Sequence, residues 1–364
     1  CSIQVNGTAV LTIVSGTNVT VNRGVSIGSS ANIIVQNNAN LIQVEHLNNS
    51  GIATVNRNST PIVRLDYTLW SSPVANQNVL AFSPQTLTNR FYVYNPFTGT
   101  NGAYDAIDPN SNDFIPAKGY LVRAPNNWSS TVYSNYSGVF TGTFNNSYFK
   151  PVVKKGISGY NAIGNPYPSA LDADEFIKDN IKETINGKAG RNNVNVFNGA
   201  LYFWDHFTLS NNHLLAEYEG GYATYNLMGG VIGMANVPLA ANTGKSGTKV
   251  PERYIPVGQG FFVEAILDPL LSTTNTTITG GNLNFKNSQR VFKREGFTGT
   301  NNGSLFMKTA LSKESNAQGT TTDTRSKIRL IFDSPLGYRR PLLVGVDENA
   351  SNHFDLGYDA PLNE

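Results

Sequence analysis

The feature that most constrains the fold of this chain is an internal duplication of aromatic blocks. Three blocks recur further along the chain in the same order, and a weaker fourth pair follows at the matching place. The paired blocks are 66–73 and 159–166, 91–98 and 201–208, 114–122 and 254–263, and 140–144 and 278–282. Several matches in one order are improbable by chance. The sequence therefore predicts two copies of one β-module, with longer insertions in the second.

The blocks have the pattern of half-buried strands. Aromatic residues alternate with polar ones, which predicts one buried face and one face in water. Each copy also carries an Ile-Pro pair, Ile115-Pro116 or Ile255-Pro256, that is followed closely by glycine. Glycine permits close backbone approach or a positive φ, so each pair is predicted to be a turn that enters a core strand.

Residues 1–60 show short apolar runs separated by Gly, Asn or Ser. The runs alternate in the manner of strands and are spaced by about seven to ten residues, which is tight for a meander of hairpins. Such spacing favours the rungs of a small β-solenoid, in which each rung covers the one before. The edge of a sandwich is the alternative.

One helix is predicted after the second copy's first block. Its apolar face consists of Leu171, Phe176, Ile177 and Ile181. Asp172 and Asp174 lie near its start, where a carboxylate satisfies free backbone N–H groups and opposes the positive end of the helix dipole. We therefore expect them to cap the helix rather than to act in catalysis.

A third unit begins near residue 303. Its strand signals are Leu305-Phe306-Met307, 328–332 and 341–346. A sandwich normally needs about seven strands, so this unit is predicted to be partial. The predicted fold class is all-β, with a solenoid-like segment over 1–60, a duplicated β-sandwich region over 61–300 (repeats of about 61–150 and 151–300) and the start of a sandwich over 301–364.

Composition excludes several function classes. Charged residues make up only 14% of the chain and the formal net charge is +2, whereas a nucleic-acid binder needs a concentrated basic face. No run approaches the ~20 apolar residues of a transmembrane helix, so no transmembrane segment is predicted. A signal peptide is not evident. Cys1 is the single cysteine; it is expected to be a mid-chain residue, with the acylated first residue of a lipoprotein as the alternative.

No catalytic motif is present. The four histidines, among them His206 and His213, lack metal-ligand spacing, and there is no nucleophile elbow, phosphate loop or dinucleotide fingerprint. We therefore expect a protein that is not an enzyme.

Calcium is the one inorganic cofactor that the sequence suggests. Five oxygen-bearing residues crowd one loop: Asp105, Asp108, Asn110, Asn112 and Asp113. Hard cations prefer such ligands, but the order is not that of an EF-hand. The alternative, which we favour, is a loop whose side chains bond their own backbone.

Trp128 is the candidate for ligand binding, because it lies in a polar loop where a sugar could stack on it. Trp70 and Trp204 lie inside the repeated blocks and are expected in the core, as aromatic residues of strands usually are.

The blocks resemble a recurring region of large secreted surface proteins of gliding Bacteroidota. The similar pieces are 41–43, 67–73, 164–169 with 171–174, and 255–262, and the segment from Arg329 to Asp359 looks like the opening of a type C sorting domain. The resemblance implies export by the type IX secretion machinery, contact with outer-membrane surface components and residence on the cell exterior. The chain departs from the family by ending before a sorting domain would be complete.

Two functions are consistent with this pattern. The first is a non-catalytic extracellular module, an adhesin or stalk linked to gliding motility. The alternative is a carbohydrate-binding module of a secreted hydrolase, with glycans as its partners.

Overall fold

The protein is all-β, as predicted. The computed structural model describes residues 1–100, 102–182, 190–206, 220–234, 247, 249–266, 279–295, 306, 323–335 and 339–361. Within these ranges strands form several separate sheets and the only α-helices are two short ones. No helix in the described ranges has the length and apolar character needed to cross a membrane.

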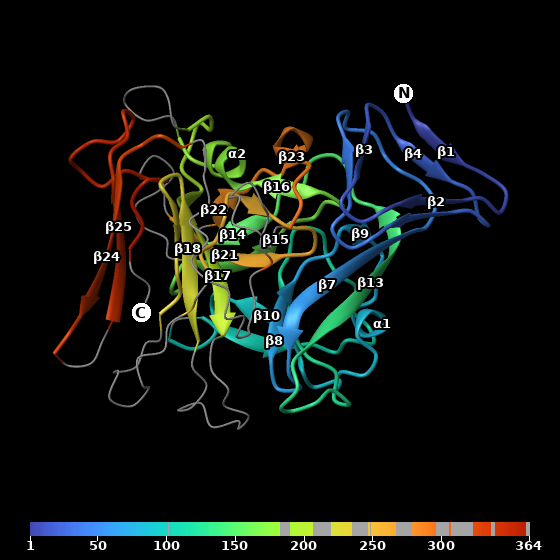
Figure 1. The fold of residues 1–364 in the computed structure, drawn as a ribbon, viewed down its shortest axis with the longest axis horizontal. Coiled ribbons are helices and arrows are strands. Elements are labelled where there is room, and N and C mark those ends of the chain that lie inside the picture. The colour runs from blue at the N-terminus through green and yellow to red at the C-terminus, as the bar shows by residue number, and fades with distance from the viewer. Residues whose placement is uncertain are drawn as a thin grey trace.

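The N-terminal segment is a parallel β-solenoid, at one end of the molecule (Figure 1). Its strands are β1 (Ile3–Val5), β2 (Val10–Ile13), β3 (Asn18–Val21), β4 (Val25–Ile27), β5 (Asn32–Val35) and β6 (Asn40–Gln43). β1 pairs with β4, β2 with β5 and β3 with β6, and in each pair the partner lies 22 residues further along the chain. Inward β-branched residues such as Ile13 and Val21 are buried between the rungs. The predicted stack of rungs is confirmed.

Strand β7 (Ala53–Ile62) joins the solenoid to the first module. It pairs in parallel with β5 and antiparallel with β13 (Ser134–Phe144), which in turn pairs with β9 (Val74–Ala75). The resulting sheet has the order β2-β5-β7-β13-β9. The same sheet therefore contains solenoid rungs and sandwich strands.

The predicted duplication is confirmed by the strand order. The first module contains β8 (Tyr67–Trp70), β10 (Phe91–Asn95), β11 (Ala103–Ala106) and β12 (Tyr120–Arg123), in the order β8-β12-β10-β11. The second contains β15 (Tyr160–Gly164), β17 (Phe197–His206), β18 (Gly220–Asn226), β19 (Gly229–Val231) and β21 (Gly260–Ala265), in the order β15-β21-β17-β18-β19. Each recurring block supplies the same strand in both modules.

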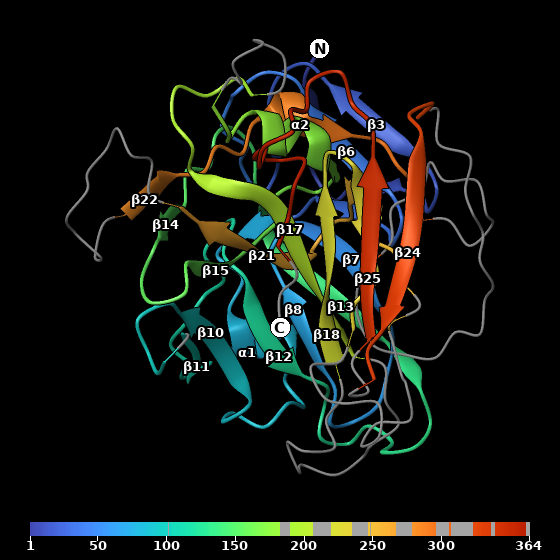
Figure 2. The same cartoon turned by 90° about the vertical axis from the view of Figure 1, so that its left-hand side faces the viewer.

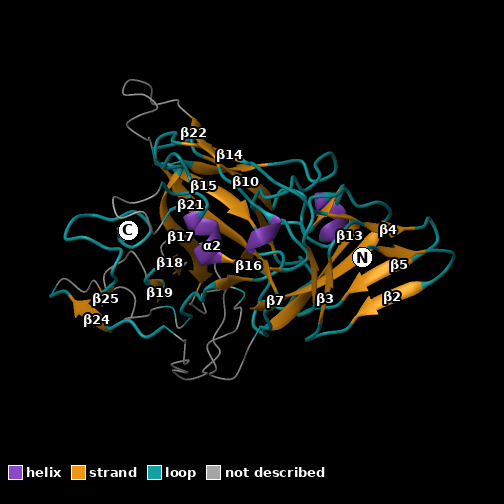
Figure 3. Ribbon diagram, turned by 90° about the horizontal axis from the view of Figure 1, so that it is seen from above, coloured by secondary structure: helices purple, strands orange, loops and turns teal. Residues whose placement is uncertain are grey.

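A second layer covers the outer face of each module's sheet. In the second module it is built from β14 (Val152–Lys154), β16 (Ala170–Asp172), β20 (Tyr254–Ile255), β22 (Thr279–Asn282), β23 (Arg290–Val291) and η1 (Asn287–Gln289). β14 pairs with β22 as β7 pairs with β13. Figure 3 shows the helices lying among the strands of these layers.

The predicted helix is shorter than expected. It is α2 (Ala173–Lys178), and Asp172 caps it by accepting hydrogen bonds from the backbone N–H groups of Asp174 and Glu175. The capping role of Asp172 is therefore confirmed. Leu171 is the middle residue of β16, and Ile181 lies beyond the helix end. The four residues predicted to form one helical face therefore lie in a strand, in the helix and in the segment after it.

The first module has an equivalent helix that the sequence did not reveal. It is α1 (Val79–Phe82), capped by the side chain of Asn78. In both helices a buried phenylalanine, Phe82 or Phe176, lies four residues after the cap. A single helical turn is too short to give a recognisable apolar period, which explains why it was missed.

The two modules are related by an approximate twofold axis. Trp70 and Ile163 are equivalent in the duplication, as are Lys118 and Gln259 when the blocks are aligned on Gly119 and Gly260. Trp70 forms an antiparallel bridge with Gln259, and Ile163 forms one with Lys118. Each module thus contributes the same two positions to the contact, as in a symmetric dimer.

Reciprocal backbone hydrogen bonds reinforce this contact. The N–H of Ser71 donates to the carbonyl of Gly258 over 2.9 Å, and the N–H of its equivalent, Gly164, donates to the carbonyl of Ala117 over 3.2 Å. Ala117 and Gly258 both have a positive φ, of 63° and 76°. Each turn after an Ile-Pro pair therefore contains a residue in the left-handed region of φ, as the glycine in the second copy indicated.

The inner faces of the two modules' sheets pack on each other. The buried centre of this layer is Leu69, Ala200, Tyr202 and Phe262. Further tyrosines from both modules surround it, including Tyr94, whose ring meets that of Phe262 at 5.0 Å. In Figure 2 the strands of the two modules lie in adjacent layers at the centre of the molecule.

The third unit contributes a hairpin of β24 (Lys327–Asp333) and β25 (Arg339–Gly345). It lies at the opposite end of the molecule from the solenoid (Figure 1). Of the predicted strand at 305–307, Leu305 and Met307 are outside the described residues. Phe306 is buried against Trp70 of the first module, with ring centroids 5.1 Å apart.

The twofold contact leads to a stability prediction. A Cβ on Gly119 would lie 2.9 Å from the carbonyl oxygen of Ile163, and one on Gly260 would lie 2.6 Å from Leu69 Cγ. We expect Gly119→Ala and Gly260→Ala each to lower the free energy of unfolding by about 1–3 kcal/mol. Gly28→Ala is the control, because its Cβ would make only ordinary contacts of 3.5 Å or more. Urea unfolding would measure all three; an equal effect of Gly28→Ala would contradict the prediction.

Candidate functional site

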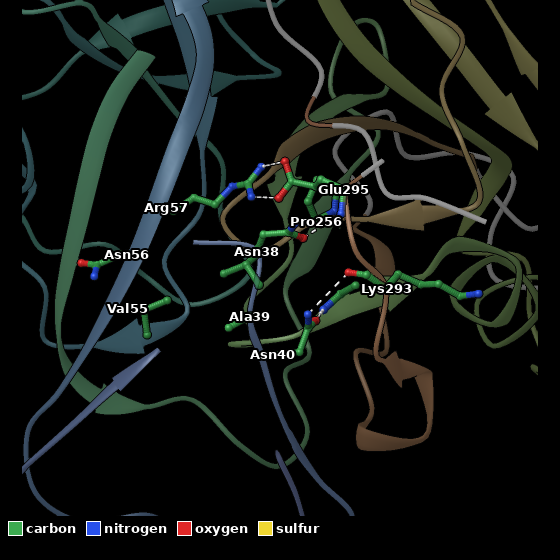
Figure 4. A pocket seen from close by; sticks show the side chains of 11 residues that line it. Asn38, Ala39, Asn40, Val55, Asn56, Arg57, Pro256, Lys293 and Glu295 are labelled. Atoms are coloured by element: carbon green, nitrogen blue, oxygen red, sulfur yellow. Dashed lines mark hydrogen bonds and ion pairs between the residues drawn. The ribbon is translucent and has the colours of Figure 1, made fainter. Parts of the chain in front are cut away.

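The most concentrated polar site joins the solenoid to the end of the second module. Buried residues alternate along β7, and Arg57 takes an inward position on it, with only 2% of its side chain exposed. Its guanidinium binds both carboxylate oxygens of Glu295, with 2.7 Å between Nη2 and Oε2 (Figure 4). A planar two-point contact of this kind is among the strongest charge-assisted hydrogen bonds.

Asparagines at the solenoid turns hold this ion pair in place. Asn38, whose φ is 64°, accepts a hydrogen bond from the Glu295 N–H over 2.7 Å through Oδ1. Asn37 accepts from the N–H of Asn58 over 2.8 Å. On its other side the Arg57 guanidinium lies 4.5 Å above the ring of Phe306. The site is therefore assembled from four distant parts of the chain.

The electrostatics of the site indicate a structural role. Burial lowers the pKa of Arg57 to about 9, and the Glu295 carboxylate offsets the cost of keeping the cation charged there. The cavity beside the pair measures about 10 Å³. That volume is about one water molecule, which leaves no room for a substrate.

A second buried arginine also connects the solenoid to the end of the second module. Arg290, in β23, donates from Nη2 to the carbonyl oxygen of Leu41 over 2.6 Å and from Nη1 to Asn146 Oδ1 over 2.8 Å. Its guanidinium lies 4.8 Å above the ring of Tyr167. Burial lowers the pKa of Arg290 to about 10. The segment 286–295 thus runs along the solenoid turns and is tied to them at several points.

A third buried polar contact lies between the two modules. His206, at the end of β17, contacts Asp66 just before β8, with 2.9 Å between Nδ1 and Oδ1. Both side chains are buried, and Asp66 also accepts the N–H of Val63 over 2.9 Å. Lys249 is buried as well; burial lowers its pKa, and the carboxylates of Asp205 and Asp66 oppose that shift. His213 lies outside the described residues.

The predicted calcium loop is not gathered into one site. Asp105 lies on β11 and accepts a hydrogen bond from Asn95 over 2.7 Å. Asp108 accepts from the backbone N–H and the side chain of Asn110, which lowers the pKa of Asp108. Asp113 forms a bridge with Asn78. Nowhere in the described ranges do three acidic, histidine or cysteine side chains form a group that could hold a metal ion.

An amide takes the position at the centre of this loop. The Nδ2 atom of Asn78 donates to the carbonyl oxygens of Pro109, Asn110 and Asn112 at 3.1–3.2 Å. The side chain of Asn112 in turn donates to the carbonyl oxygen of Asp108. The loop carbonyls that could coordinate a cation are therefore bonded within the protein, in agreement with the alternative that we favoured.

Trp128 is only partly available for a ligand. Its side chain is half-buried and its ring meets that of Tyr136 edge-on at 5.9 Å. The indole N–H is buried. Of the other two tryptophans, Trp70 is buried in the core as predicted, whereas Trp204 is half-buried against Tyr222.

Sequence reasoning missed the ionic joints for identifiable reasons. Glu295 lies 238 residues from Arg57, and Asp66 lies 140 residues from His206. One signal was available: Arg57 follows Ala53 and Val55 on the inward face of a strand. A cation at such a position must find a partner, because an unpaired buried charge is very costly.

The comparisons with known proteins assign a family but no activity. A family model described as a domain of unknown function (DUF8693) matches residues 1–364, and the chain belongs to that family. No curated protein and no solved structure matches the chain.

The Arg57 joint gives a mutational prediction. Glu295→Gln removes the charge that compensates a buried arginine but keeps one acceptor, so we expect a loss of about 2 kcal/mol in the free energy of unfolding. Glu45→Gln is the matched control, because Glu45 pairs with Arg23 at 3.8 Å and both side chains are more than half exposed. It should cost under about 0.5 kcal/mol. Equal effects in urea titrations would argue against a structural joint at Arg57.

A partly buried carboxylate gives a pH prediction. Burial raises the pKa of Glu252 from 4.5 to about 7. The folded state then binds more protons than the unfolded state between these values, so this group's contribution to stability falls as the pH rises from 4.5 to 7. We expect Glu252→Gln to stabilise the protein by about 1 kcal/mol at pH 8 and to have little effect at pH 4.5. Thermal melts of the wild type and the variant across this pH range measure the effect. If Glu252 were fully solvated, the difference between the two proteins would not grow as the pH rises.

Proposed function

Since membership in this family gives the chain no function, we propose one from its own residues: a non-catalytic extracellular module, an adhesin or stalk, exported by the type IX secretion system. The observation that carries the proposal is the use of buried charge. The buried Arg57–Glu295 ion pair and the buried His206–Asp66 hydrogen bond both join distant segments. Enzymes instead direct such groups into a cleft that admits a substrate.

Two cavities in the described part of the chain support this view. The first lies beside Arg57 and the second beside Trp70 and Tyr136, and each measures about 10 Å³. Small-molecule sites are typically hundreds of Å³ in volume. A surface that acts through its loops and strand faces is the better candidate for function.

The arrangement of the parts suits a stalk. The solenoid and the hairpin β24–β25 lie at opposite ends (Figure 1), and the two modules between them share a continuous inner core. Within the described residues of the two modules, force would have to separate packed sheets. This packing supports a role in display or attachment, and the resemblance to surface proteins of gliding bacteria supports a link to motility.

The hairpin supports the sorting-domain part of the proposal. Large apolar side chains lie on one face of the ribbon and are 47–62% exposed: Ile328, Leu330, Phe332, Leu342 and Val344. The other face carries Ile331, which is also exposed, and Arg329, which donates to the carbonyl oxygen of Gly230 over 2.7 Å. In a sandwich such an apolar face is covered by a second sheet. This half-built form is consistent with the opening of a sorting-type sandwich.

Localisation in the producing bacterium tests the proposal. We expect antibody to label the protein on intact cells and we expect inactivation of the type IX system to retain it in the periplasm. Leu330→Asp with Leu342→Asp should lower surface labelling severalfold, because both side chains lie on the proposed sandwich face. Val132→Asp is the control, since Val132 is 65% exposed elsewhere. Unchanged surface labelling in the absence of the secretion system would refute the export route.

A further inference from the structure

Three arginines meet at one end of the first module's sheet. Arg123 is the last residue of β12, and its N–H donates to the carbonyl oxygen of Arg90, just before β10, over 3.2 Å. Arg64 precedes β8, the other neighbour of β12. The guanidinium groups of Arg90 and Arg64 both lie within Coulombic range of that of Arg123. Like charges gathered in this way repel one another unless an anion neutralises them.

The described part of the chain supplies no acidic partner for this cluster. None of the three arginines forms an ion pair there. Asp66 is the acidic residue nearest to Arg64 in the sequence, but its carboxylate oxygens contact His206 and the N–H of Val63. The cluster is therefore a concentration of positive charge in a chain where only 14% of the residues are charged.

Arg123 is buried without the partners that other buried arginines have. It is 4% exposed, yet its guanidinium makes one hydrogen bond, from Nη2 to Asn126 Oδ1 over 3.1 Å, and its buried Nε has no partner in the protein. In contrast, Glu295 neutralises Arg57, and all three side-chain nitrogens of Arg290 donate to oxygens. Burial lowers the pKa of Arg123, and its two cationic neighbours lower that pKa further. An uncompensated buried cation of this kind indicates a bound anion.

The second module carries the opposite charge at the equivalent position. Arg123 is equivalent to Glu264 in the duplication. The two residues pair in the same register, Arg123 with Tyr67 and Glu264 with Tyr160. Glu264 has a partner inside the protein, because it accepts a hydrogen bond from Asn198 over 2.9 Å. The shared fold thus requires no arginine at this position, and the cationic cluster is a property of the first module.

We propose that Arg64, Arg90 and Arg123 bind the sulfate or carboxylate groups of an acidic polysaccharide. A guanidinium group can bind such an oxyanion through two parallel hydrogen bonds. Arg64 and Arg90 are half-buried, so a ligand can reach them from solvent. Three cations suit one or two anionic groups, whereas nucleic-acid binding needs an extended basic face.

The surroundings of the cluster favour a glycan. Asn89 and Asn126 are exposed beside the arginines, and their amides can bond sugar hydroxyls. Asn126 also belongs to the loop of Trp128, the residue predicted to bind a ligand. The inference names a class of target for the proposed attachment module, and in that sense it rests on the proposed function. Binding is measured on the purified chain and export in cells, so either can fail alone.

Calorimetric titration of the purified full chain with three polymers tests the proposal. The polymers are dextran sulfate, polygalacturonate and neutral dextran. We expect at least one of the two acidic polymers to bind, with an affinity that falls as the salt concentration rises, and we expect no binding of neutral dextran. Dextran sulfate and polygalacturonate distinguish a sulfate ligand from a carboxylate ligand. The proposal is overturned if neither acidic polymer binds, or if neutral dextran binds equally well.

Substitutions locate the binding. Arg64→Gln and Arg90→Gln should each weaken it at least about tenfold, because each removes charge-assisted hydrogen bonds to the ligand. Arg23→Gln is the matched control, since it removes the same charge from an exposed pair with Glu45, and it should change the affinity less than about twofold. Arg123→Gln should abolish binding without lowering the Tm, whereas an arginine needed for the fold would lower the Tm. Circular dichroism establishes that each variant is folded. Equal affinities of Arg90→Gln and Arg23→Gln would exclude this site.

Discussion

The contact on which the rest of the structure depends is the reciprocal pairing of the two Ile-Pro turns with the first strand of the opposite module. Ser71 with Gly258 and Gly164 with Ala117 make equivalent backbone hydrogen bonds. Because the bonds belong to the backbone, they require only a left-handed residue at each turn and little bulk at the axis. Two divergent copies can therefore keep the contact while their loops differ greatly in length.

The other long-range contacts supplement this symmetric pairing. Arg57 and Arg290 connect the solenoid to the end of the second module, far from the twofold axis. Arg57 is in a buried ion pair with Glu295, whereas Arg290 binds amide and backbone oxygens. Buried charges contribute little net stability compared with apolar packing, but they penalise any arrangement that leaves them unpaired. Their effect is to select one relative placement of the solenoid and the modules. A chain with only 14% charged residues thus uses several of its charges to define geometry.

Periodicity and repetition determined what could be predicted from the sequence. The all-β class, the solenoid rungs and the duplicated strand order follow from patterns that extend over many residues, such as the runs from Val10 to Gln43. The contact between Arg57 and Glu295 could not be predicted, because the two residues are 238 positions apart. One sequence alone does not show which distant charged residues are in contact. The helix α1 was missed since one turn has no period, and the Asp108 loop remained ambiguous because a cation and the amide of Asn78 satisfy the same carbonyls.

The uneven distribution of charge separates the two ends of the molecule. The solenoid has Arg23 as its only charged residue before Glu45. At the opposite end, Arg325, Lys327 and Arg329 direct their side chains toward Asp323 or toward carbonyls of the second module. Those cations fix the orientation of the hairpin and leave its apolar face directed to solvent. For the surface module that we propose, this difference would keep the two ends from competing for the same partners.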